Sequence, residues 1–130
     1  MSKYVQTLPS QAAAGATSTT VIGTAEATDD LSNELSAVVL TPPAGFTTVT
    51  GVATNNVTFN VRQLRAGTPL GTVASVTLAT GTNLVAETPL EVPITTPFAV
   101  EAGDVFDVQM VQNGTGLAVG AGVLAQVELI

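Results

Sequence analysis

Residues 100–130, VEAGDVFDVQMVQNGTGLAVGAGVLAQVELI, decide the fold class of this chain. Larger apolar side chains alternate with other residues along 104–112 and again along 122–130, and glycine-containing turns separate the two runs. A period of two is typical of a strand with one buried face, and Asn113-Gly114 is a strong hairpin signal. We therefore expect two antiparallel strands. The buried face of the first is expected to carry Phe106, Val108 and Met110.

Further runs with strand character follow one another at short spacing upstream of this segment. They cover residues 17–25, 35–41, 46–53, 57–66, 70–79 and 90–95. With the two C-terminal runs they make about eight strands, and no window has the 3.6-residue period of an amphipathic helix. The expected fold is therefore all-β, a jelly-roll β-sandwich of about eight antiparallel strands, which we prefer to an immunoglobulin-like sandwich.

Two irregularities refine this prediction. Along 57–66, Val57, Phe59 and Val61 share one face while Leu64 falls on the other, so a bulge near Arg62-Gln63 would return Leu64 to the core. Pro93 lacks an amide hydrogen, which predicts that the strand 90–95 lies at a sheet edge or on a bulge.

Residues 1–16 are small, polar and rich in alanine, and they lack clear alternation. We expect an extended N-terminal arm at 1–16 followed by a single sandwich domain at 17–130. The sizeable apolar side chains of the arm, Tyr4, Val5 and Leu8, are its candidate anchors in a groove on a partner. Val73, Val105 and Val111 are expected to point outward, where apolar side chains need cover from another subunit.

Composition excludes several classes of function. The 130 residues contain no Cys and no His, which removes thiolate chemistry, cysteine metal sites and histidine-based catalysis. Three basic against ten acidic residues give a net charge of −7, so nucleic acid is not an expected partner. The uncharged stretch 117–127 is too short and too glycine-rich to span a bilayer, and the N-terminus lacks the apolar core of a signal peptide. We expect no enzyme activity, cofactor or membrane partner.

Charged residues leave two questions open. Glu101, Asp104 and Asp107 cluster in sequence, as do Asp29, Asp30 and Glu34, and oxygen ligands of this kind can hold calcium, although neither cluster has a known calcium-loop spacing. Arg62 and Arg65 are the only cations of the expected domain. They either pair with exposed acids or anchor an interface.

Two stretches carry a resemblance to a known family. VTFNVRQLRAGTPLGTVASVTLATGTNL (57–84), followed by VEAGDVFDVQMVQNGTGLAVGAGVLAQVEL (100–129), resembles the decoration proteins of tailed bacteriophages, also called cement or head-fibre proteins. The likeness covers about residues 35–130. Its most recognisable parts are the turn Ala102-Gly103-Asp104 and the glycine-rich hairpin 113–122. Similar turns occur in trimeric jelly rolls of the tumour-necrosis-factor and complement-head type.

The resemblance implies a structural protein without catalytic residues. It predicts a homotrimer that is made in the bacterial host cytoplasm and binds the major capsid protein on the outer capsid surface of the virion. The alternative is the receptor- or carbohydrate-binding head domain of a viral fibre, which would need a concave pocket with aromatic side chains. The chain has one Tyr, four Phe and no Trp, a composition that favours the decoration protein.

Overall fold

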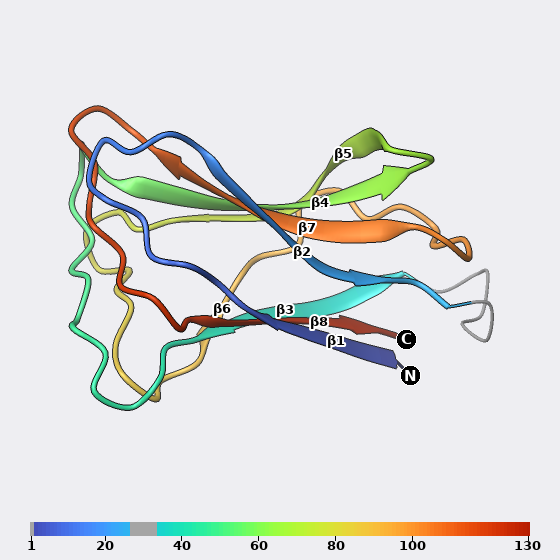
Figure 1. The fold of residues 1–130 in the computed structure, drawn as a ribbon, viewed down its shortest axis with the longest axis horizontal. Coiled ribbons are helices and arrows are strands. Elements are labelled where there is room, and N and C mark those ends of the chain that lie inside the picture. The colour runs from blue at the N-terminus through green and yellow to red at the C-terminus, as the bar shows by residue number, and fades with distance from the viewer. Residues whose placement is uncertain (1, 27–33) are drawn as a thin grey trace.

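A computed structural model describes residues 2–26 and 34–130 of the chain. The described part is all-β, and Figure 1 shows its strands in two layers. The strands are β1 (Ser2–Thr7), β2 (Ser18–Thr24), β3 (Leu35–Thr41), β4 (Val57–Arg65), β5 (Thr68–Thr77), β6 (Leu90–Glu91), β7 (Val105–Gln112) and β8 (Leu124–Leu129).

The strand order is that of a jelly roll. One four-stranded sheet has the order β1-β8-β3-β6 and the other the order β2-β7-β4-β5, with every pairing antiparallel. The pairs β1–β8, β2–β7 and β3–β6 nest around the β4–β5 hairpin. One long antiparallel ribbon, folded at β4–β5 and rolled up, gives this arrangement. The predicted fold class is confirmed.

The hydrophobic core lies between the two sheets. Phe106, Val108 and Met110 on β7 are at most 1% exposed, which confirms the face predicted for this strand. On β4, Phe59 and Val61 face the same interior, and β8 contributes Val127. Side chains that alternate with these lie on the outer faces, because successive residues of a strand point to opposite sides of the sheet.

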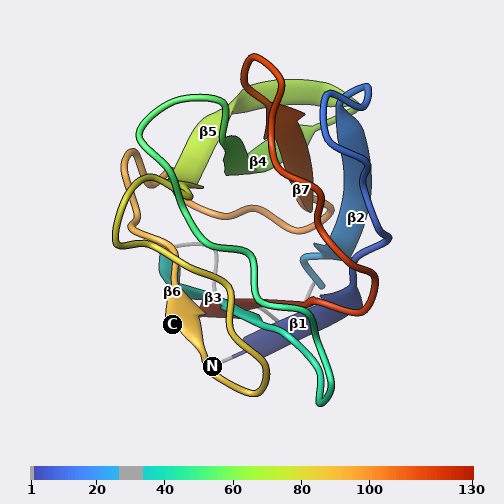
Figure 2. The ribbon, with the colours of Figure 1, turned by 90° about the vertical axis from the view of Figure 1, so that its left-hand side faces the viewer.

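Residues 46–53 were predicted to form a strand, and this prediction is wrong. The segment belongs to the loops that close one end of the sandwich, seen face-on in Figure 2. Its apolar side chains Phe46 and Val49 are buried there, and Val49 exchanges two backbone hydrogen bonds with Leu84. The buried residues Phe46, Val49 and Gly51 do not follow a period of two, and a single bridge replaces the ladder of a strand.

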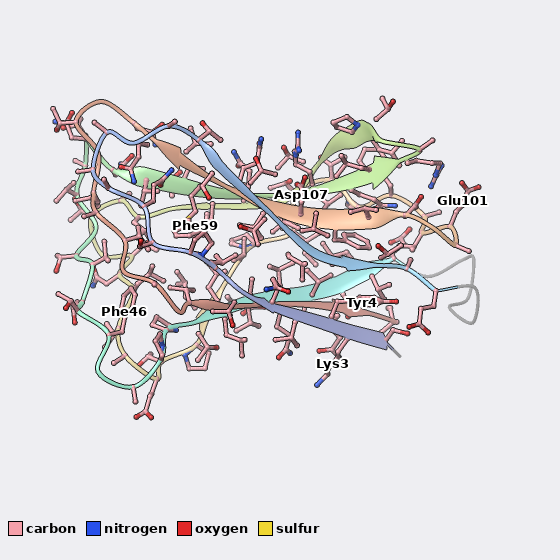
Figure 3. All side chains as sticks on the ribbon, in the orientation of Figure 1. Lys3, Tyr4, Phe46, Phe59, Glu101 and Asp107 are labelled. Atoms are coloured by element: carbon pink, nitrogen blue, oxygen red, sulfur yellow. The ribbon has the colours of Figure 1, made fainter. Side chains whose placement is uncertain are left out.

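The extended arm predicted for residues 1–16 is not confirmed. Ser2–Thr7 form β1, an edge strand paired along its whole length with β8. Leu8 is 2% exposed and continues the pairing by two backbone hydrogen bonds, to Val123 and Gly122. Tyr4 packs against the core, and Lys3 points away from it (Figure 3). Tyr4 and Leu8 thus anchor the N-terminal segment to its own domain.

The contact between Tyr4 and Gly23 joins the two sheets along one side of the sandwich. A Cβ atom at Gly23 would lie 2.7 Å from the Cβ atom of Tyr4, closer than real side chains pack. We expect Gly23→Val to push β1 off the fold and to cost about 1–3 kcal/mol of unfolding free energy, the usual penalty of overpacking. Chemical denaturation measures it. A stability equal to that of the parent would contradict this packing.

Candidate interaction surface

The outer face of the β2-β7-β4-β5 sheet is built from uncharged polar and β-branched side chains in cross-strand rows, together with one Arg–Asp ion pair. We call this surface the hydroxyl–amide face. It consists of Thr19, Val21, Thr58, Asn60, Arg62, Ser75, Thr77, Asp107, Gln109 and Val111. One row joins Thr19, Gln109, Asn60 and Ser75 on neighbouring strands.

Side-chain hydrogen bonds hold these rows together. The Ser75 hydroxyl donates to Oδ1 of Asn60 over 2.7 Å, and the hydroxyl oxygens of Thr58 and Thr77 are 2.8 Å apart. Cross-strand pairs of this kind stabilise neighbouring strands by about 0.2–1 kcal/mol each. The face therefore has fixed rather than freely rotating polar groups.

One ion pair crosses the centre of the hydroxyl–amide face. Arg62 on β4 donates from Nε to Oδ1 of Asp107 over 2.9 Å and from Nη2 to Oδ2 over 2.7 Å. Asp107 lies on β7 directly opposite Arg62 and is 3% exposed. The hydrogen bonds with Asp107 raise the pKa of the Arg62 guanidinium above its ordinary value, although burial opposes the shift. The two charges cancel locally, which leaves the face electrically neutral at its centre.

A second polar cluster lies where β4 ends and β7 begins. Arg65 donates from Nε and Nη2 to the two carboxylate oxygens of Asp104 over 2.9 and 2.8 Å, and it forms an ion pair of 2.7 Å with Glu101. Asp104 is fully buried, and its Oδ2 also accepts hydrogen bonds from Nε2 of Gln63 and from the Glu101 amide. These bonds tie the turn before β7 to β4.

The carboxylates of the first candidate ion site, Asp104 and Asp107, are paired with arginines. Both oxygens of Asp104 and both of Asp107 accept hydrogen bonds from arginines, so these carboxylates act as structural partners of Arg65 and Arg62. Within residues 2–26 and 34–130, no three His, Cys, Asp or Glu side chains are arranged to hold a metal. Of the second acidic cluster, Asp29 and Asp30 lie outside the described residues, and Glu34 is exposed.

The Asp104 site makes stability depend on pH. Burial alone would raise the pKa of this carboxyl, but hydrogen bonds from Arg65, the Glu101 amide and Gln63 hold its pKa below the ordinary 3.8. Because the folded-state pKa is depressed, the ionised Asp104 carboxylate contributes stability that is fully present above pH 3.8. This contribution is lost as the pH falls through the lower, folded-state pKa. We expect the melting temperature to fall steeply in that acidic window. Asp104→Asn should flatten this part of the curve, and an unchanged slope would contradict the assignment.

Of the outward valines, Val73 does not lie where the sequence predicts it. It is fully buried, because β5 has extra residues at two places opposite β4: Arg62 pairs with Thr72 and Val61 with Ala74, which leaves Val73 between them. Each bulge shifts the alternation of β5 by one residue. Val105 and Val111 are half-buried on the outer side of β7, as predicted.

The bulge predicted near Arg62-Gln63 occurs at that level of the ladder but on the partner strand. β4 itself alternates regularly, so its inward position after Val61 is Gln63, fully buried, and Leu64 stays half-buried on the outer side. The amide of Gln63 donates to Asp104, while its Oε1 is the one buried side-chain polar atom without a partner among the described residues. A polar residue thus takes the core position that the sequence reasoning gave to Leu64.

The structure also shows exposed apolar residues that the sequence reasoning missed. Val21 on β2 is 55% exposed and Leu124 on β8 is 38% exposed, while Val5 of the predicted set is 46% exposed. The neighbours Val21 and Ile22 look equivalent in sequence. Val21 pairs with the outward Asp107, and Ile22, the next residue of the strand, points into the core.

All aromatic side chains pack into or against the core. Phe59 and Phe106 are fully buried, Phe46 is 9% exposed, and Tyr4 and Phe98 pack on the core from its border.

No helix in the described part of the chain is long and apolar enough to cross a membrane.

Comparisons with known proteins give no match: no protein-family model, no curated protein and no solved structure is significantly similar to this chain.

Proposed function

We propose that this protein is a structural decoration protein that binds the outer surface of a phage capsid and stabilises it by protein–protein contacts. The hydroxyl–amide face supports the proposal most directly. It offers many hydrogen-bonding groups and two outward valines, Val21 and Val111, and its one cation is already neutralised by Asp107. A partner protein covers such a surface without desolvating unpaired charge, which is the main cost that charged residues add to an interface.

The folding requirements of the chain fit the same role. The jelly roll closes its core without a disulfide, since the chain has no Cys, so it can fold in a bacterial cytoplasm where thiols stay reduced. The proposed partner is the major capsid protein, and the proposed location is the outer surface of the virion. The alternative, a carbohydrate-binding fibre head, needs exposed aromatic rings for stacking, whereas the rings of this chain pack on its own core.

Binding to capsids tests the proposal. Purified protein is mixed with empty heads of the phage whose genome carries its gene, and the heads are pelleted. We expect saturable binding with a fixed number of copies per head. Protein that stays in the supernatant at every concentration would contradict the proposal.

A pair of variants tests which surface binds. Val111→Asp adds a charge to the hydroxyl–amide face, and Leu124→Asp adds the same charge to the outer face of the other sheet. Both residues point outward, so both variants should fold. We expect Val111→Asp to weaken head binding by about tenfold or more and Leu124→Asp to leave it near the parent value. The opposite order would place the capsid contact on the β1-β8-β3-β6 sheet.

A further inference from the structure

The four edge strands of the sandwich differ in how they are protected. An edge strand exposes backbone N–H and C=O groups that can pair with another chain, and proteins block such edges with charges, prolines, short strands or covering segments. The edges here are β1 and β6 of one sheet and β2 and β5 of the other.

Three of these edges carry a protective feature. The edge of β5 is covered by the segment after β6, because the Ser75 amide donates to the Pro93 carbonyl over 3.1 Å and the Thr95 amide to the Val73 carbonyl over 2.8 Å. β6 has only two residues and lies between Pro89 and Pro93. β1 carries the exposed Lys3.

The edge of β2 carries none of these features. Its sequence, STTVIGT, has no charge and no proline. Among the described residues, no backbone hydrogen bond joins residues 18–22 to a segment other than β7. Thr19 and Val21 on its outer side are exposed, and Val21 at 55% is the most exposed large apolar side chain of any described strand.

We propose that β2 pairs edge to edge with β2 of a second copy of this chain. The pairing is antiparallel about a two-fold axis through Thr20, perpendicular to the sheet. Directly opposed residues of an antiparallel pair lie on the same face of the sheet, so Thr20 meets its own copy and Thr19 meets Val21 of the second chain. The register shift between Val21 and Gly23 ends regular pairing at that point.

The distribution of charge supports a second copy of this chain as the partner of the β2 edge. The chain has a net charge of −7, so two copies repel each other. Repulsion opposes contact least at a site where the local charge is close to zero. β2 is uncharged, and Asp107, which lies opposite Val21 on β7, is neutralised by Arg62. The β2 edge is therefore a place where two copies can meet without facing like charges.

The pairing has a structural consequence. It joins two four-stranded sheets into one of eight strands, and because the axis is perpendicular to the sheet, both hydroxyl–amide faces turn the same way. The two-fold pair is an alternative to the homotrimer expected from the sequence, and Val73, one of the three valines behind that expectation, is in the core. The inference concerns the protein alone and does not depend on capsid binding.

Sedimentation equilibrium over a range of concentrations tests the pairing. We expect the parent protein to approach twice its 13.0 kDa chain mass as concentration rises. Val21→Lys should raise the dissociation constant by about tenfold or more, because lysine on an edge opposes strand addition. Val5→Lys, at a similarly exposed position on β1, should leave it unchanged. A parent that stays monomeric or forms a trimer would overturn the proposal, as would equal effects of the two lysines.

A single cysteine tests the register. The chain has no Cys, so Thr20→Cys introduces the only thiol. Directly opposed residues in an antiparallel pair have Cα atoms about 4.5–5.5 Å apart, within the range that a disulfide spans. We expect mild oxidation to give a covalent dimer much faster for Thr20→Cys than for Thr7→Cys, the matched edge position on β1. Equal rates would overturn the two-fold axis at Thr20.

Discussion

Replacing Phe106 by alanine is expected to lower the free energy of unfolding by about 3–5 kcal/mol, enough to unfold much of the protein at physiological temperature. Phe106 is fully buried between the sheets, on the strand that β2 and β4 flank on either side. The truncation removes most of a ring from a close-packed core and leaves a cavity that the surrounding strands can fill only partly. Thermal and chemical denaturation measure the loss.

Val111→Ala is the matched control on the same strand. Val111 is half-buried on the outer side of β7, so its truncation should cost about 1 kcal/mol or less. If the two variants were equally stable, Phe106 would belong to an interface and the face assignment of β7 would fail. A loss of capsid binding by Phe106→Ala without a change in melting temperature would lead to the same conclusion.

Asp104→Ala is expected to have the second-largest effect, about 3 kcal/mol. The variant removes a fully buried carboxylate that accepts four hydrogen bonds, from two nitrogens of Arg65, from Gln63 and from the Glu101 amide. The Gln63 amide is left in the core with only the Ala99 carbonyl as an acceptor, 3.2 Å away. Leaving buried donors underused costs more than the net gain of the original bonds.

Glu101→Gln separates this buried network from the exposed ion pair beside it. The Glu101 side chain is 55% exposed and also pairs with Arg65, so its neutralisation should cost about 0–1 kcal/mol, as for other surface ion pairs. Equal losses from Asp104→Ala and Glu101→Gln would show that burial of Asp104 contributes nothing. Chemical denaturation at neutral pH decides between the two outcomes.

The strands that the sequence predicts well are those with large apolar residues on one face. β7 and β8 alternate without interruption, and their partners on both sides bury the same face, so local pattern and final structure agree. β1 was missed because only Tyr4 of its six residues packs against the core, and a single inward side chain gives no readable period. The segment 46–53 shows the reverse case, because its composition resembles that of a strand but its pairing is the isolated bridge between Val49 and Leu84.

The interaction surface depends on features that no local pattern contains. Arg62 and Asp107 are 45 positions apart, and only the register of β4 against β7 brings them together. Val73 is buried because of extra residues in β5 opposite β4, and the position of a bulge depends on both strands. The open edge of β2 likewise becomes visible only when the protection of the other three edges is known.

Difference imaging of phage heads by electron cryomicroscopy tests the proposed function most directly. Heads assembled with and without this protein are compared at a resolution that shows strands. We expect added density on the outer surface of the shell, with the shape of the two-layered sandwich and with the β2-β7-β4-β5 sheet turned toward the capsid protein. Identical maps, or added density only at the tip of a fibre, would contradict it.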